Sequence, residues 1–279
     1  MNLIVKIGFV KLGNIGSSPM IDLLFDERAD REDIDIRCVG TGAKLGGEQS
    51  EEAAKNIIEF NPSLVIVSSP NAALPGPTKA RDILAKSNIP TIIVSDAPSK
   101  KAVPNITEKG FGYIIVEADA MIGARREFLD PSEMAIFNGE IIKILAITGA
   151  FNVLFIEIDK VIEAIKRNEK PDLPQIVINK NVAVNTAKFE NPYAKAKAMA
   201  AYEMLRKVAE LDSEGCFKIQ EREKYVPVVA AAHELLRSAS KLADEARELE
   251  KGTDNLVRMP HRKDGCILIK RKLNEKPKI

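Results

Sequence analysis

The alternation of short apolar runs with helical patterns up to Val116 is the feature that most constrains the fold. The apolar runs are nearly continuous and rich in β-branched residues, as expected for strands covered on both faces of a sheet. They span Leu3–Val10, Ile34–Val39, Leu64–Val67, Thr91–Val94 and Tyr113–Val116. Helical patterns lie between the first four, at Ser17–Glu27, Gln49–Glu59 and Thr78–Lys86. Such alternation predicts βαβ crossovers and therefore an α/β fold: a Rossmann-like parallel sheet with helices on both faces.

The pattern changes after Ala120, where long helical segments replace the alternation. We expect helices at Pro131–Thr148, Ile156–Arg167, Pro192–Leu211 and Pro227–Leu249, three of them with proline in the first turn. A minor strand is expected at Gln175–Ile178, and a short C-terminal strand at Cys266–Ile269 before a basic tail. The sequence thus predicts an α/β sheet domain at 1–125 that carries ligand-binding loops, and a C-terminal helical region at 126–279.

Charge and cysteine usage exclude several classes of protein. The 41 basic and 40 acidic residues leave a net charge of +1, whereas proteins that bind nucleic acid or membrane surfaces usually carry a basic excess. The three cysteines form no CxxC pair, so neither a zinc site nor a disulfide framework is indicated. The apolar N-terminus is too short for a membrane span and lacks a signal-peptide cleavage pattern. We expect a cytoplasmic protein without a metal.

The loops that follow the predicted strands are unusually rich in glycine, serine, asparagine and proline. In an open parallel sheet, ligands bind outside the carboxyl ends of the strands, and small residues let a ligand approach the backbone. We therefore expect a ligand site there. The candidate residues are Lys11, Gly13, Asn14, Gly16, Ser17 and Ser18 in the first loop, Gly40, Thr41 and Gly42 in the second, Pro70 and Asn71 in the third, and Asp96, Ala97 and Pro98 in the fourth.

The first of these loops departs from the dinucleotide fingerprint G-x-G-x-x-G. Lys11 stands where the first glycine should be, and the second strand ends without the acidic residue that binds a ribose. NAD is therefore disfavoured, while NADP remains open through Arg37. The helix expected to start near Ser17 still offers free N–H groups and the positive end of its dipole to an anion.

A second dense patch of charge follows the fifth predicted strand. It contains the adjacent Arg125 and Arg126, followed by Glu127. These residues form a surface ion-pair cluster on one interpretation and bind a carboxylate or phosphate of a ligand on the other. Asp130 and Pro131 have the residue types of a helix N-cap and first turn.

No other group of residues indicates acid–base or nucleophilic catalysis. His233 lies in a helical pattern, where a packed side chain is the usual outcome, and His261 lies in a loop, where a ligand contact is one interpretation. The sequence has no GxSxG elbow and no Walker loop. We expect no catalytic side chain, because hydride transfer to a good acceptor depends above all on positioning.

Several strings resemble the coenzyme F420-dependent methylenetetrahydromethanopterin dehydrogenases along nearly the whole chain. The most specific are KLGNIG at 11–16, GARREFLDP at 123–131 and ADEARELEK at 243–251. Leu12 departs from the family, where cysteine is expected, and the loop Lys44–Glu52 is shorter than usual. Neither difference removes a group that we regard as essential.

This resemblance implies an oxidoreductase of methanogenesis and archaeal one-carbon metabolism. A hydride would pass reversibly from methylene-tetrahydromethanopterin to coenzyme F420, a dissociable co-substrate, giving the methenyl product and reduced F420 without a metal. The small-residue loops would hold the deazaflavin and its phosphate, and Arg125, Arg126 and Glu127 would lie on the substrate side. The family is homo-oligomeric, a hexamer built as a trimer of dimers. Two alternatives stay open: an NADP-dependent oxidoreductase, and a non-catalytic regulatory protein with a Rossmann-like sheet.

Overall fold

The computed structural model describes residues 4–122 and 130–279, and these group into two compact units. A sheet unit comprises Met1–Val116, Leu154–Val177 and His261–Ile267, and a helical unit comprises Glu117–Val153, Ile178–Pro260 and Leu268–Ile279. The division into domains after residue 125 stays a prediction. Two segments from the C-terminal half of the chain, Leu154–Val177 and His261–Ile267, belong to the sheet unit.

The sheet has six strands in the order β2-β1-β3-β4-β5-β6. They are β1 (Val5–Lys11), β2 (Ile34–Gly40), β3 (Leu64–Ser69), β4 (Thr91–Asp96), β5 (Gly112–Val116) and β6 (Gln175–Ile178). Strands β1 to β5 pair in parallel. Every residue of β3 and β4 is buried, which explains why their apolar runs are continuous rather than alternating. The Rossmann-like parallel sheet is confirmed.

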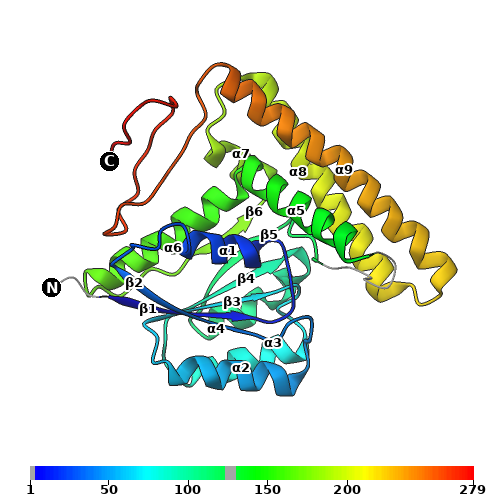
Figure 1. Cartoon of the computed structure of the whole chain (residues 1–279). Coiled ribbons are helices and arrows are strands. Elements are labelled where there is room, and N and C mark those ends of the chain that lie inside the picture. Colours follow the sequence, from blue (N-terminus) through cyan, green and yellow to red (C-terminus); the bar gives the residue numbers. More distant parts are fainter. Residues whose placement is uncertain (1–3, 123–129) are drawn as a thin grey trace. The chain divides into compact units, whose positions relative to one another are not determined.

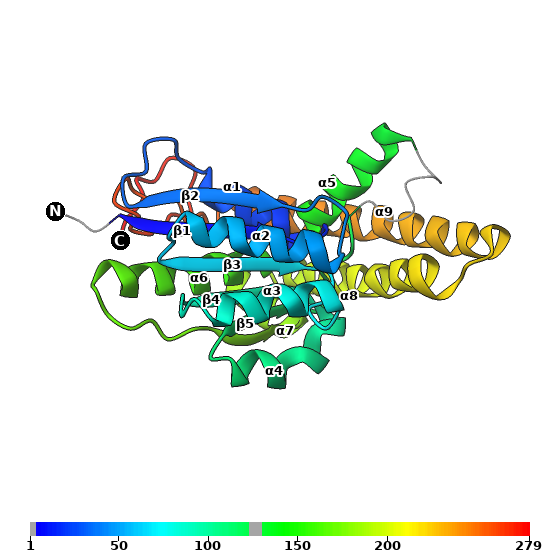
Figure 2. The same ribbon diagram turned by 90° about the horizontal axis from the view of Figure 1, so that it is seen from below.

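Helices cover both faces of this sheet. In Figures 1 and 2, α2 (Gly47–Glu59), α3 (Pro75–Ala85) and α4 (Val103–Glu108) lie over one face, and α1 (Ser17–Phe25) and most of α6 (Ala150–Lys166) lie over the other. Sequence patterns predicted α1, α2, α3 and α6. They missed the 3-10 turn η1 (Ala97–Ala102) and α4, because the prolines that begin these two short turns obscure any helical period.

The strand order places a topological switch point beside β1. Lys11, the last residue of β1, is opposite Gly40 of β2 on one side and Ser68 of β3 on the other. The chain therefore leaves the carboxyl end of β1 towards one neighbour and the carboxyl end of β3 towards the opposite edge. A crevice between such diverging connections is the usual ligand site of open α/β sheets.

The helical unit contains α5 (Pro131–Thr148), α7 (Lys180–Ala187), α8 (Pro192–Ser213), the π-helical turn η3 (Glu214–Lys218) and α9 (Arg222–Gly252). Helices α8 and α9 lie side by side (Figures 1 and 2). Asp130 caps α5 as its residue type suggested, because its carboxylate accepts from the backbone N–H of Glu133 at 2.8 Å.

Two expectations for the C-terminal half were wrong. Helix α9 begins at Arg222, so Pro227 lies inside the helix, where its missing N–H removes one helical hydrogen bond, and not in the first turn. The strand expected at Cys266–Ile269 is not a regular strand: Ile267 and Ile269 make only isolated bridges, with His261 and Lys278.

Within the described residues no single helix is long and apolar enough to cross a membrane. The consecutive helices α5 and α6 meet that test of length and composition only when they are taken together, and the pair is bent.

Asp212, in the last turn of α8, is a buried carboxyl group without a partner. Its exposed fraction is 0%, and in the described part of the chain neither carboxylate oxygen has a hydrogen-bond partner. Burial disfavours the charged form, so the pKa of Asp212 is raised well above the ordinary 3.8. A raised carboxyl pKa means that the folded state must bind a proton that the unfolded chain releases at neutral pH.

Replacing Asp212 with Asn is therefore expected to stabilise the protein. Asparagine needs no proton, so the free energy of unfolding at pH 7 should rise. The gain should shrink as the pH falls towards and below 3.8, the ordinary carboxyl pKa, because the wild type is then protonated in both states. Urea denaturation at pH 7 and pH 4 measures this difference. Asp244→Asn, at an exposed ion pair with Lys143, is the control and should change little. A gain that is equal at both pH values would contradict the assignment.

Candidate active site

The loop after β1 stands at the switch point and is in contact with the loops after β2 and β3. Gly13 has a φ of +75°, a conformation that favours glycine. A side chain there would meet Leu45 of the second loop at 3.1 Å and Pro70 of the third at 3.2 Å. Since three loops converge on one glycine, this position has no room for a larger residue.

Helix α1 opens directly from this loop with its first turn free of acidic groups. Its N-cap is Gly16, which contributes no side-chain hydrogen bond. The N–H of Ser18 donates to the carbonyl of Ile15 at 3.1 Å, and the positive end of the helix dipole still favours an anion at this end of α1. The first-turn residues Ser17 and Ser18 are themselves buried, and the hydroxyl of Ser18 lies 2.9 Å from that of Ser68. In this structure Ser18 thus contributes to packing between α1 and β3.

Lys11 lies at the same edge but already has a partner. Its ammonium is 2.9 Å from the carboxylate of Asp22 in α1, and both side chains are partly exposed. Burial alone would lower the pKa of Lys11, yet the hydrogen bond to Asp22 and the negative charge around it outweigh burial and raise the pKa. The charge expected from the sequence is present, but Asp22 compensates part of it.

The loop after β2 is braced against the first loop. The backbone N–H of Thr41 donates to the carbonyl of Lys11 at 3.0 Å, and the N–H of Gly13 donates to the Thr41 hydroxyl at 3.3 Å. Gly42 has a φ of +61° and open space where a side chain would start. These contacts hold Thr41 against the first loop, while space stays open at Gly42.

The loops after β3 and β4 are linked by a chain of buried serine hydroxyls. Ser95 lies 2.6 Å from Ser99, and Ser99 accepts from the N–H of Ala72 at 2.7 Å. The side chains of Asn71 and Asp96 fold back on their own loops, accepting from the N–H groups of Ala73 at 3.0 Å and Ala97 at 2.6 Å. These contacts fix the shape of the two loops.

The fourteen candidates of the four loops thus occupy one edge of the sheet, at the carboxyl ends of adjacent strands. The register that makes them neighbours pairs Lys11 with Gly40 and with Ser68, and Ser69 with Ser95. The substrate-side candidates Arg125, Arg126 and Glu127 lie outside the described residues. Their assignment stays a prediction.

Arg37, the residue that kept NADP open, does not reach this edge. It pairs with Gly8 in the middle of β1, three residues before the strand end. Its guanidinium donates to Asp35 at 2.8 Å and lies over the ring of Phe60, 4.9 Å from its centroid. The structure therefore gives no support to a 2′-phosphate site at Arg37.

His233 is packed, as its place in a helical pattern indicated. Its ring stacks on Phe137 of α5 with centroids 3.8 Å apart. Burial lowers its pKa to about 4, so the imidazole is neutral at physiological pH.

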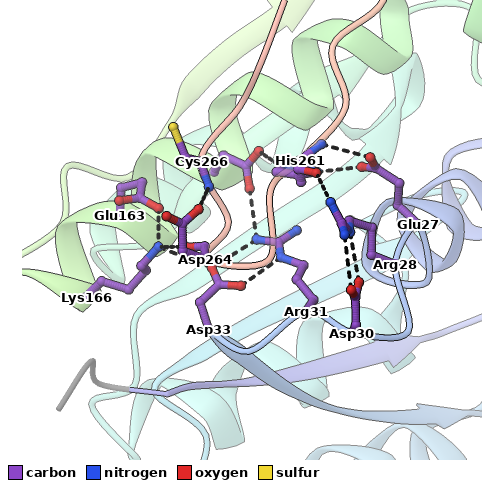
Figure 3. Close-up of polar contacts among 11 residues, drawn as sticks. Glu27, Arg28, Asp30, Arg31, Asp33, Glu163, Lys166, His261, Asp264 and Cys266 are labelled. Carbon is purple, nitrogen blue, oxygen red and sulfur yellow. Dashed lines mark hydrogen bonds and ion pairs between the residues drawn. The ribbon is translucent and has the colours of Figure 1, made fainter. Parts of the chain in front are cut away.

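His261, in contrast, belongs to a buried ionic cluster that sequence reasoning missed (Figure 3). The His261 cluster comprises Glu27, Arg31, Asp33, Asp159, Lys166 and His261. Its members come from the connection between α1 and β2, from α6, and from the segment 261–267. Nothing in the local sequence around any of them signals this meeting, because Glu27, Asp159 and His261 are far apart in the chain.

Both ring nitrogens of His261 face carboxylates. Nδ1 is 2.5 Å from Glu27 and Nε2 is 2.6 Å from Asp159, while the side chain is 0% exposed. A ring that faces acceptors on both sides is satisfied when both nitrogens carry protons. Burial alone would lower the pKa of His261, but the hydrogen bond and charge of Asp159, with Glu27, raise it above 6.5. His261 is therefore held as an imidazolium.

Arg31 and Asp33 extend the cluster towards the start of β2. Nε of Arg31 donates to Asp33 at 2.9 Å, and Lys166 reaches the other oxygen of Asp33 at 3.3 Å. A side chain at Gly265, whose φ is +82°, would meet Asp33 at 1.9 Å. Asp33 directly precedes β2, so the cluster lies at the amino end of that strand, opposite the candidate ligand edge. Its role is to attach the segment 261–267 to the sheet unit.

The contribution of the charged His261 side chain to the free energy of unfolding should depend on pH. Because the pKa of His261 is raised in the folded state, its charged form stabilises the fold fully below about pH 6.5, the pKa of an unperturbed histidine. This stabilisation is lost as the pH rises through the folded-state pKa. The difference in unfolding free energy between the wild type and His261→Gln should therefore decrease from pH 6 to pH 9. Denaturant titrations across this range measure it. A constant difference would show that His261 does not titrate with unfolding.

Comparison with known proteins identifies the family. The family model described as methylene-5,6,7,8-tetrahydromethanopterin dehydrogenase matches residues 5–278. The chain belongs to this family. Relatives named F420-dependent methylenetetrahydromethanopterin dehydrogenase are 55% identical in Archaeoglobus fulgidus and 53% identical in Methanothermobacter thermautotrophicus, each alignment covering 99% of this chain and 100% of the relative.

A solved structure of the family matches the whole fold. It is 49% identical, covers 99% of this chain and 100% of its own, and superposes with a TM-score of 0.94. That structure is described as an F420-dependent methylene-tetrahydromethanopterin dehydrogenase in complex with methylene-tetrahydromethanopterin and coenzyme F420. The resemblance seen in the sequence strings is thus confirmed at the level of the family and the fold.

Proposed function

We propose that this chain catalyses reversible hydride transfer between methylene-tetrahydromethanopterin and coenzyme F420, giving methenyl-tetrahydromethanopterin and reduced F420. The observation that carries the proposal is the full-length match to a family whose solved member holds both ligands. Neither an NADP-dependent enzyme nor a non-catalytic regulatory protein explains that match, and Arg37 is engaged away from the ligand edge.

The residues at the carboxyl edge of the sheet fit the deazaflavin and its phosphate. The loop Gly13–Ser18 offers an uncapped helix start to an anion. Gly13 has a positive φ and is closely approached by Leu45 and Pro70, while Gly42 has a positive φ with open space beside it. We assign Lys11, Asn14, Gly40, Thr41, Pro70, Asn71 and Asp96 to Pro98 to the same ligand, and Arg125, Arg126 and Glu127 to the substrate side.

In this mechanism the chain positions two rings and needs no catalytic side chain. Coenzyme F420 supplies the hydride acceptor when it is bound. The loops would position the two ligands for direct transfer, which needs the reacting atoms roughly 3–3.5 Å apart. The product is a cation formed by loss of hydride alone, so no base has to remove a proton from carbon. Within residues 4–122 and 130–279, no three His, Cys, Asp or Glu side chains are grouped as metal ligands.

The direct test is spectroscopic. Adding methylene-tetrahydromethanopterin should bleach the absorbance of oxidised F420, and equal concentrations of NAD or NADP should give no comparable turnover. The rate should survive treatment with EDTA. Comparable turnover with a nicotinamide would overturn the choice of co-substrate, and loss of activity that zinc or iron restores would reveal a metal site.

We further propose a cytoplasmic homo-oligomer, a hexamer built as a trimer of dimers. Its support is the surplus of small and apolar residues in the helical region, because stable interfaces of this type are apolar and often exceed about 2,000 Å². Light scattering at low micromolar concentration should give a hexamer. A fully active monomer would contradict this assembly.

A further inference from the structure

Arg81 of α3 is a buried cation that forms no ion pair with any acidic residue in the described part of the chain. Its exposed fraction is 2%. All three of its hydrogen-bond acceptors are neutral: Nη1 donates to the carbonyl of Ala72, and Nη2 donates to the Thr78 hydroxyl at 3.1 Å and to the side-chain oxygen of Asn105 at 3.3 Å. Nε has no partner. The neighbouring Asp82 is paired with Lys109 at 2.8 Å.

Packing alone does not explain a charge at this position. A buried charge is strongly unfavourable unless it is paired, and a methionine of similar length would fill the space without that cost. Burial lowers the pKa of Arg81, yet a guanidinium stays charged at physiological pH. The cost of burying this cation points to a role beyond folding.

The contacts of Arg81 lead to two of the ligand-binding loops. Ala72 directly follows Pro70 and Asn71, and its own N–H is held by Ser99 of η1. Asn105 belongs to α4, which continues the element that begins at Asp96. The guanidinium therefore links the loop after β3 to α4, which follows the loop after β4.

We infer that Arg81 is a positioning residue for the anionic co-substrate. It fixes the turn Asn71–Ala73 against η1 and α4, and it places a positive charge beside the loop after β3. This role rests on the proposed function, in which those loops hold the deazaflavin phosphate. The pterin, which we assign to the Arg125 side, should depend on Arg81 much less.

The test compares three variants of the whole enzyme. Arg81→Met removes both the charge and the forked set of N–H donors. Arg81→Lys keeps the charge but loses the forked donors. The control, Lys79→Met, removes one charge from the exposed face of the same helix, where Lys79 pairs with Glu51. Fluorescence titration gives the Kd of F420, steady-state kinetics give KM for the pterin and kcat, and thermal unfolding followed by circular dichroism verifies folding at the assay temperature.

Arg81→Met is expected to raise the Kd of F420 about tenfold, as for one lost charged hydrogen bond. Arg81→Lys should raise it about threefold, because lysine does not replace a forked donor. KM for the pterin and kcat should stay within about twofold, and Lys79→Met should match the wild type. If Arg81→Met does not fold, the Kd of F420 for Arg81→Lys tests the inference.

Two results overturn the inference. An unchanged Kd of F420 in the folded Arg81 variants would remove Arg81 from this role while the proposed function stands. Equal weakening for F420 and the pterin would show general loosening of the fold and not positioning of one ligand. A wild-type protein that neither binds nor reduces F420 would instead overturn the proposed function, and this role with it.

Discussion

Replacing Asp33 with Asn is expected to lower the free energy of unfolding by about 3–5 kcal/mol, as removal of one partner from a buried ion pair does. Asp33 is 2% exposed and accepts from Arg31 and Lys166. Its loss leaves these two cations buried with one carboxylate fewer. Burial would raise the pKa of Asp33, but the hydrogen bond and charge of Arg31, with Lys166, hold it below 3.8.

Asp30→Asn is the matched control for this experiment. Asp30 makes the same kind of pair with Arg28, at 2.9 Å, but on the surface, where such pairs contribute about 0–1 kcal/mol. Because the folded-state pKa of Asp33 is depressed, its stabilisation is present above pH 3.8 and lost as the pH falls through the folded-state pKa. Equal midpoints for the two variants in urea at pH 7 would show that the His261 cluster does not hold the sheet unit together.

The sheet was predictable because its signal is local. Each of the first five strands is an apolar run bounded by turn residues, and the chain order of strands and helices restricts the topology. The strand order itself, with its switch point between β1 and β3, is a tertiary property. The sequence pattern of Leu154–Val177 also suggests a helical region, although this segment belongs to the sheet unit.

The place of the candidate site was predictable, but its internal contacts were not. Loop composition alone located the fourteen residues at one edge, since the carboxyl ends of parallel strands must lie together. The pairing of Lys11 with Asp22 and the clamp of Arg81 on Ala72 depend on how α1 and α3 rotate against the sheet. Side-chain orientation of that kind is set by packing between elements, which no local pattern encodes.

The His261 cluster shows the same limit more strongly. Its histidine stands in a polar loop string, RMPHRKDG, that would suit a solvent-exposed turn equally well. Burial comes from the docking of residues 261–267 against Glu27 and Asp159, which requires the complete fold. The folded chain explains the glycine at 265, because any side chain there would collide with Asp33.

Replacing Gly13 with Val is expected to lower kcat/KM for F420 about a hundredfold, the effect of displacing reacting groups by about 1 Å. The first carbon of the new side chain would already lie 3.1 Å from Leu45 and 3.2 Å from Pro70, and the branches of valine need more room. The loops after β2 and β3 must then move away from the loop after β1. Stopped-flow bleaching of F420 and its fluorescence titration measure the two consequences.

Gly110→Val separates this displacement from backbone strain. Gly110 has a φ of +73°, close to the +75° of Gly13, but open space where a side chain would start, and it precedes β5 at the amino end of the sheet. Both variants should lose about 1–2 kcal/mol of stability from the left-handed conformation. Only Gly13→Val should lose hydride transfer, because only Gly13 separates the ligand loops. Equal activity in the two variants at a temperature where both are folded would place the F420 site elsewhere.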